Sequence, residues 1–164
     1  MRRRYYIEDI EHYAEQQVTL EGWLAGRRSS GKILFLQLRD GSGFIQCVAS
    51  RADIGDETFE QLDALPLESS LRLTGTVSAD DRAPGGFEVT VSAAEVVGTA
   101  EEYPITRKEH GVSFLMDHRH LWIRSSRQFA VLRIRAAVVA AAKRYFDSRG
   151  YVQMDTPILT PTAC

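Results

Sequence analysis

Cysteine, proline and long apolar runs are all scarce in this sequence of 164 residues. The two cysteines, Cys47 and Cys164, have no neighbouring ligands at metal-binding spacing, which argues against a disulfide framework and against redox chemistry. No apolar run is long enough to cross a bilayer, and Arg2, Arg3 and Arg4 lead into acidic residues and not into the apolar segment of a secretion signal. These absences predict a cytoplasmic protein.

Two kinds of cofactor motif are missing as well. His110, His118 and His120 have no Cys or acidic partner at zinc-like spacing, so no metal site is expected. The Gly-Ser-Gly segment at 41–43 lacks the third glycine and the following helix of a dinucleotide-binding loop, and it is interpreted as a hairpin turn. We expect this chain to hold no cofactor by itself.

Neither sign of charge is in large excess, because 20 Lys and Arg face 22 Asp and Glu. The distribution is uneven: residues 51–100 hold 3 basic and 10 acidic side chains, whereas residues 101–164 hold 10 basic and 6 acidic ones. A polyanion would therefore have to meet local groups of Lys and Arg. Composition permits RNA binding but does not predict it.

The first hundred residues contain five short β-forming runs. Turns at 29–31 and 40–43 separate the runs 18–28, 33–40 and 44–49, and a turn at 83–86 separates 71–79 from 87–97. A helix is predicted over 56–65, with Asp56 as N-cap and Pro66 as the stop. This order of elements, β-β-β-α-β-β, is that of the OB-fold, a five-stranded Greek-key barrel that often binds oligonucleotides. Trp23 is predicted to lie in its core.

The rest of the chain has a different pattern. Residues 98–110 lack periodicity and predict a linker, whereas 126–149 predict a long helix ended by Gly150, followed by a short strand over 151–155. One side of this helix carries an apolar stripe, formed by Phe129, Leu132, Ala136, Val139 and Phe146. The predicted domains are residues 1–98, a linker over 99–125, and residues 126–164.

Two groups of motifs resemble those of asparaginyl-tRNA synthetases. The segments 21–28 and 32–46, which include Asp40-Gly41-Ser42-Gly43-Phe44-Ile45-Gln46, are similar to the anticodon-binding domain of the aspartyl, asparaginyl and lysyl enzymes. The segment 146–160 is similar to motif 1 of class II synthetases, a helix and strand at the dimer interface that end in a proline, here Pro157. The segments 119–124 and 162–164 favour the asparaginyl over the aspartyl enzymes, with the lysyl enzymes last.

The resemblance implies an OB-fold anticodon-binding domain, a linker, and the first helix and strand of an α+β catalytic domain. The family's enzymes use ATP and Mg²⁺ to ligate asparagine to its tRNA, and they act as homodimers. Because the family's motifs 2 and 3 are not in this sequence, no catalytic residue is named and the chain alone is expected to be inactive. Two alternatives stay open: an aspartyl enzyme, and a free-standing module that binds single-stranded nucleic acid, against which motif 1 argues.

The resemblance also implies four anticodon-binding residues. Phe35 would stack on the central anticodon base, a uridine, while the Gln46 amide would contact the edge of that base. Arg28 would contact the same base or its phosphate, and Glu88 corresponds to a position close to the first anticodon base.

Strand alternation tests part of this assignment. Leu34 and Leu36 flank Phe35, so alternation places Phe35 on the opposite side of the strand from both leucines. For the same reason Arg27 faces away from Arg28. The alternatives are that Phe35 is a core residue and that Gln46 is an ordinary solvated side chain.

Overall fold

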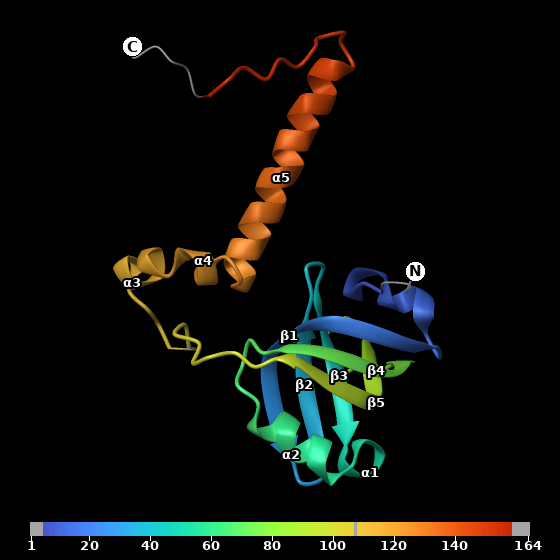
Figure 1. The fold of residues 1–164 in the computed structure, drawn as a ribbon. Coiled ribbons are helices and arrows are strands. Elements are labelled where there is room, and N and C mark those ends of the chain that lie inside the picture. The colour runs from blue at the N-terminus through green and yellow to red at the C-terminus, as the bar shows by residue number, and fades with distance from the viewer. Residues whose placement is uncertain (1–4, 107, 159–164) are drawn as a thin grey trace. The chain divides into compact units, whose positions relative to one another are not determined.

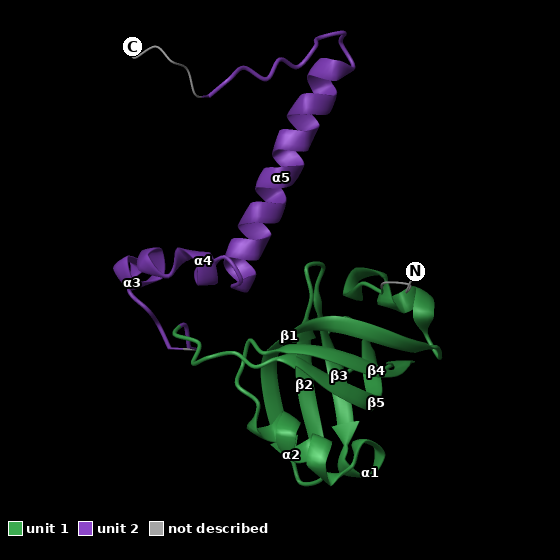
Figure 2. Ribbon diagram, viewed as in Figure 1, with its two compact units in different colours: residues 1–104 green, residues 105–164 purple. Residues whose placement is uncertain are grey.

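The computed structural model describes residues 5–106 and 108–158. Contacts divide the chain into two compact units, residues 1–104 and 105–164 (Figure 2). The three-part domain division made from the sequence remains a prediction.

The first unit is a closed barrel of five strands (Figure 1). Its strands are β1 (Gln17–Ser30), β2 (Ile33–Arg39), β3 (Phe44–Ser50), β4 (Ser70–Ala79) and β5 (Phe87–Gly98). They are hydrogen-bonded in the order β1-β2-β3-β5-β4, and β4 pairs with β1 to close the barrel. Every pair is antiparallel except β3 with β5, which is parallel. The predicted OB-fold is confirmed, as are its five strands and their turns.

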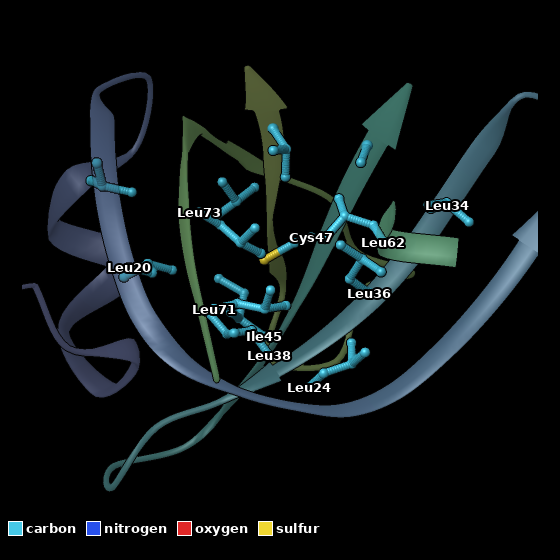
Figure 3. Packing of buried hydrophobic residues seen from close by; sticks show 14 of the residues in the cluster. Leu20, Leu24, Leu34, Leu36, Leu38, Ile45, Cys47, Leu62, Leu71 and Leu73 are labelled. Atoms are coloured by element: carbon cyan, nitrogen blue, oxygen red, sulfur yellow. The ribbon is translucent and has the colours of Figure 1, made fainter. Parts of the chain in front are cut away.

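Alternating leucine, isoleucine and valine side chains fill the barrel (Figure 3). On β2, for example, Leu34, Leu36 and Leu38 are fully buried while the residues between them are not. Two helices add apolar groups to the same core: a 3-10 helix, η1 (Ile7–Tyr13), supplies Ile7 and Ile10, and α2 (Asp56–Ala64) supplies Phe59 and Leu62. These side chains form one hydrophobic cluster inside the barrel, so the side chains that are open to ligand contact are those that face outward.

Two interactions fix the C-terminal end of β2. The Arg39 guanidinium makes two hydrogen bonds to the Glu68 carboxylate, both 2.7 Å, and the two side chains are 13% and 8% exposed. The Asp40 carboxylate accepts hydrogen bonds from the backbone N–H groups of Ile7, Ser42 and Gly43 at 2.7–2.9 Å. Asp40 thus shapes the turn between β2 and β3 and holds η1 against it.

The described residues of the second unit form three helices, α3 (Val112–Asp117), α4 (Arg119–Trp122) and α5 (Ser126–Asp147). Helix α5 confirms the long helix predicted from the sequence. Gly150 has a φ of +82° after its end, and the Tyr151 N–H donates to the Phe146 carbonyl. No helix in the part of the chain that the structure describes has both the length and the apolarity needed to cross a membrane.

Four local predictions need correction. Trp23 is 41% exposed, since its neighbours Gly22 and Leu24 are the residues of that stretch that face inward. The N-cap of α2 is Gly55, and Asp56 is the first helical residue. Residues 151–155 form no strand, because a strand needs a partner for its backbone groups and none pairs with this segment among the described residues. Helices α3 and α4 lie where only a linker was predicted.

Two glycines allow strands to approach closely in the barrel wall. A Cβ atom on Gly75 would lie 2.2 Å from the Thr90 carbonyl oxygen, and one on Gly22 would lie 2.4 Å from that of Arg39. Both obstacles are backbone atoms, which cannot move aside without disturbing strand pairing. Gly75 also lies where the β4–β5 register shifts.

We predict that Gly75→Ala lowers the free energy of unfolding by roughly 1–3 kcal/mol or more, as overpacking typically does. Gly41→Ala is the matched control, because nothing lies within 4 Å of its new methyl group. The control should be neutral, or more stable by about 0.4–1 kcal/mol. Urea unfolding of both variants measures this, and equal midpoints would contradict the close-approach account.

Candidate nucleic-acid interface

The four residues that the resemblance assigns to a binding site lie on the outside of the barrel, in two contacting pairs. The first pair joins β1 to β2, where Arg28 and Phe35 are directly opposite each other in the antiparallel ladder. The Arg28 guanidinium carbon lies 4.5 Å from the centre of the Phe35 ring. Arg28 is exposed and Phe35 is half-buried, so the structure does not place Phe35 in the core.

The second pair joins β3 to β5. Gln46 and Glu88 are partners in the parallel ladder, and the Gln46 Nε2 donates a hydrogen bond of 3.0 Å to the Glu88 Oε2. Both side chains are half-buried. The sequence assigned both residues to one site but did not predict that they contact each other.

The two pairs belong to one continuous face. Phe35 is opposite Val48 on β3, and Val48 is opposite Thr90 on β5. Gln46 and Val48 are two residues apart on β3, so their side chains leave the same side of the sheet. We call the set Arg28, Phe35, Gln46, Val48, Glu88 and Thr90 the outer face.

The groups of the outer face suit contact with an unstacked nucleobase. An aromatic ring can stack on any base, and base–aromatic stacking contributes about 1–3 kcal/mol per base. The amide of Gln46 offers both a donor and an acceptor to a base edge. Arg28 adds a planar cation that can stack on a base or pair with a phosphate.

Arg27 contacts a different part of the molecule. Its Nη1 donates hydrogen bonds to the backbone carbonyls of Leu62 and Leu65, at 3.0 and 2.6 Å, at the end of α2. Its Nε also lies 3.8 Å from the Asp63 carboxylate. The expectation that Arg27 faces away from Arg28 is confirmed, and its role is to fasten α2 to the barrel.

The Cys47 thiol, on the strand that carries Gln46 and Val48, is not reactive. Cys47 is fully buried, and this burial, with the Glu88 carboxylate as a second cause, raises its pKa to about 12. The thiolate form is therefore almost absent at neutral pH. Nearby in the β4–β5 turn, hydrogen bonds from Arg82 lower the pKa of Asp80. The Cys47 thiol therefore supplies no nucleophile to the outer face.

One surface feature escaped the sequence analysis. A pocket of about 410 Å³ lies beside β1 and β4, lined by residues that include Tyr5, Tyr6, Trp23 and Arg72. Glu21 and Arg72, which form an ion pair, both line it, and Arg72 also pairs with Glu95. Strand alternation could have predicted that Trp23 faces outward toward this pocket, because Gly22 and Leu24 on either side of it occupy the inward positions.

The structure places Pro157 in irregular, exposed chain. Its assignment to a dimer interface remains a prediction, as do the anticodon-binding roles of the four residues above. The motif residues beyond 158 that favoured the asparaginyl enzymes lie outside the described residues. Within the described ranges, no three His, Cys, Asp or Glu side chains are grouped so that they could hold a metal ion.

Comparison with protein families defines the class. Residues 18–97 match the model of the OB-fold nucleic acid binding domain, and residues 111–164 match that of the class II tRNA synthetases for D, K and N. The first match covers the barrel strands and the second covers α3 to the end of the chain. The fold and its continuation thus define a class II aminoacyl-tRNA synthetase with an N-terminal OB-fold.

Individual relatives specify the family further. The chain is 55% identical to an asparagine–tRNA ligase of Roseiflexus castenholzii and 54% identical to one of Chloroflexus aurantiacus, each over 96% of this chain. It also superimposes on the asparaginyl-tRNA synthetase of Pyrococcus horikoshii complexed with asparaginyl-adenylate, with a TM-score of 0.90 and 34% identity over 99% of this chain. The chain belongs to the asparaginyl-tRNA synthetase family.

The match covers only part of each relative. The chain spans 36% of the length of the two bacterial ligases and 38% of the Pyrococcus horikoshii chain. An aspartyl-tRNA synthetase of Entamoeba histolytica has the same fold, with a TM-score of 0.79 at 23% identity.

The different contacts of the two neighbouring arginines predict different effects on stability. Arg27→Ala leaves two carbonyls at the end of α2 without their donors, and it should lower the free energy of unfolding by about 1–3 kcal/mol. Arg28→Ala removes only an exposed contact to Phe35 and should change it by about 1 kcal/mol or less. Urea unfolding compares the two, and a larger loss for Arg28→Ala would contradict this assignment of contacts.

Proposed function

We propose that this chain recognises the anticodon of a tRNA through the outer face of its barrel, as part of an enzyme that ligates asparagine to that tRNA. The observation that carries the proposal is the placement of Arg28, Phe35, Gln46 and Glu88 as two contacting pairs on adjoining strands of one face. The family and its asparagine ligases support the same conclusion.

In this proposal the central anticodon base stacks on Phe35. One side of the ring already carries the Arg28 guanidinium at 4.5 Å. In this proposal an incoming base either stacks on the other side of the ring or takes the place of Arg28, which then turns toward the RNA backbone. Both arrangements keep a planar cation beside the base or its phosphate.

Gln46 contacts the edge of the stacked base. In the β2–β3 ladder, Gln46 is directly opposite Gln37. Gln37 lies two residues after Phe35 on β2, so Gln46 is a diagonal neighbour of Phe35 on the same face. A base held on the Phe35 ring can therefore present its edge to the amide. This assigns affinity to Phe35 and base selection to Gln46.

The whole enzyme, in this proposal, acts in the cytoplasm on asparagine, ATP and tRNA, with Mg²⁺ as the ion that accompanies ATP. The adenylate of the Pyrococcus horikoshii complex supports an acyl-adenylate route. No described residue of this chain is assigned to ATP, Mg²⁺ or asparagine. The role proposed for this portion is to select and orient the tRNA.

The first functional prediction concerns stacking. Phe35→Ala should weaken binding of the chain to an anticodon stem–loop with a central uridine by roughly tenfold or more, because stacking contributes about 1–3 kcal/mol per base. Trp23→Ala is the matched control, since Trp23 is an exposed aromatic residue outside the outer face. Fluorescence anisotropy with labelled RNA measures both. A folded Phe35→Ala variant that binds as tightly as the parent would refute the assignment.

The second functional prediction concerns charge. If Arg28 contacts a phosphate in the complex, Arg28→Ala should reduce the slope of log affinity against log salt by about 0.7, the value for one phosphate on a single strand. Phe35→Ala should leave that slope unchanged, because it removes no charge. An unchanged slope for Arg28→Ala would assign Arg28 to the base instead of the phosphate.

We also propose that α5 forms part of a dimer interface. Its apolar side chains at seven-residue spacing, Leu132, Val139 and Phe146, are 45%, 53% and 52% exposed. Exposure of this kind along a 22-residue helix favours a protein partner.

The chain should therefore self-associate with increasing concentration in sedimentation velocity, and Val139→Glu should shift it toward monomer. Ala137→Glu is the control, because Ala137 lies on the side of α5 that carries Arg133 and Arg144. A parent chain that stays monomeric at all concentrations would contradict an interface on α5.

A further inference from the structure

The hydrogen bond between Gln46 and Glu88 fixes which atom of the amide faces which way. A carboxylate can only accept hydrogen bonds, so the amide atom that faces Glu88 has to be the nitrogen, as the 3.0 Å contact from Nε2 to Oε2 shows. The Gln46 Oε1 is then the atom left to face away from Glu88. Turning the amide over would place Oε1 against a carboxylate oxygen, with no hydrogen between them.

We infer that Glu88 is a positioning residue, which makes the site select uridine over cytidine by holding the Gln46 carbonyl toward the N3 edge of the central base. The inference deepens the proposed function and rests on it. Uracil carries a hydrogen on N3 and can donate it to Oε1. The N3 of cytosine carries a lone pair, which would meet the lone pairs of Oε1.

The backbone supports this arrangement. Gln46 and Glu88 are direct partners in the β3–β5 ladder, so the contact does not depend on a mobile loop. Glu88 on β5 also pairs with Ser78 on β4 in the antiparallel β4–β5 ladder, so its backbone lies within the wall of the closed barrel. Both side chains are half-buried, which limits the alternative positions of the amide.

This role differs from the one that the resemblance implies for Glu88, a position close to the first anticodon base. A carboxylate that accepts from Gln46 acts on the central base through that amide. The two roles therefore predict effects at different nucleotides.

The test uses the whole chain and stem–loops that differ in one base. Glu88→Gln keeps the shape of the side chain but offers a donor as well as an acceptor, so the Gln46 amide can adopt both orientations. The ratio of affinities for central uridine over central cytidine should fall by roughly two- to tenfold, as expected for one oriented hydrogen bond. Glu88→Ala, which leaves the amide free, should lower the ratio as well.

Two further variants separate a positioning role from other effects. Glu95→Gln removes the same charge from β5 at a residue that pairs with Arg72, and it should leave the ratio unchanged. In a Gln46→Ala background, Glu88→Gln should have no further effect on the ratio, because the group through which it acts is gone. Thermal unfolding confirms that each variant is folded.

The outcomes distinguish a failure of this inference from a failure of the proposed anticodon recognition on which it rests. If the parent chain does not bind the stem–loop, or binds central uridine and cytidine equally, the proposed function fails and the inference fails with it. If the parent discriminates and both Glu88 variants keep its ratio, only the inference is overturned. It is also overturned if Glu88→Gln lowers the ratio equally without Gln46, or changes only the preference at the first anticodon base.

Discussion

Closure of the five-stranded barrel is the constraint on which the rest of the structure depends. Closure directs every second side chain of each strand into one packed interior and the remainder outward. Two glycines allow the wall to close, because a side chain at Gly22 or Gly75 would collide with backbone carbonyls. The inward side chains form the hydrophobic cluster, so recognition is left to the outward side chains on a rigid support.

The outer face follows directly from this geometry. Arg28 and Phe35 meet across β1 and β2, while Gln46 and Glu88 meet across β3 and β5. Neither pair would exist if one strand slipped by a single residue, since a slip of that size turns each side chain to the other surface. The same wall that buries Leu34 and Leu36 therefore fixes the spacing between a stacking surface and a base-reading amide.

Much of this was accessible from the sequence because it depends on local pattern. The alternation around Phe35 placed it outside correctly, and turn residues marked the strand boundaries. Trp23 was wrongly predicted to lie in the core because large aromatic residues are usually buried. The alternation rule alone would have predicted that it faces outward. The contact between Gln46 and Glu88 could not be predicted, since it depends on a parallel ladder between residues 42 positions apart. The segment 151–155 has strand-like composition, but pairing needs a neighbour that composition does not supply.

The central claim is that RNA binds the outer face of the barrel and not another surface of it. A titration of the ¹⁵N-labelled chain with an anticodon stem–loop, followed by amide chemical shifts, tests this most directly. The account predicts the largest shifts at Arg28, Phe35, Gln46 and Glu88, including the side-chain amide of Gln46. Shifts that instead concentrate at Tyr6 and Trp23 beside the 410 Å³ pocket, with none on the outer face, would contradict it.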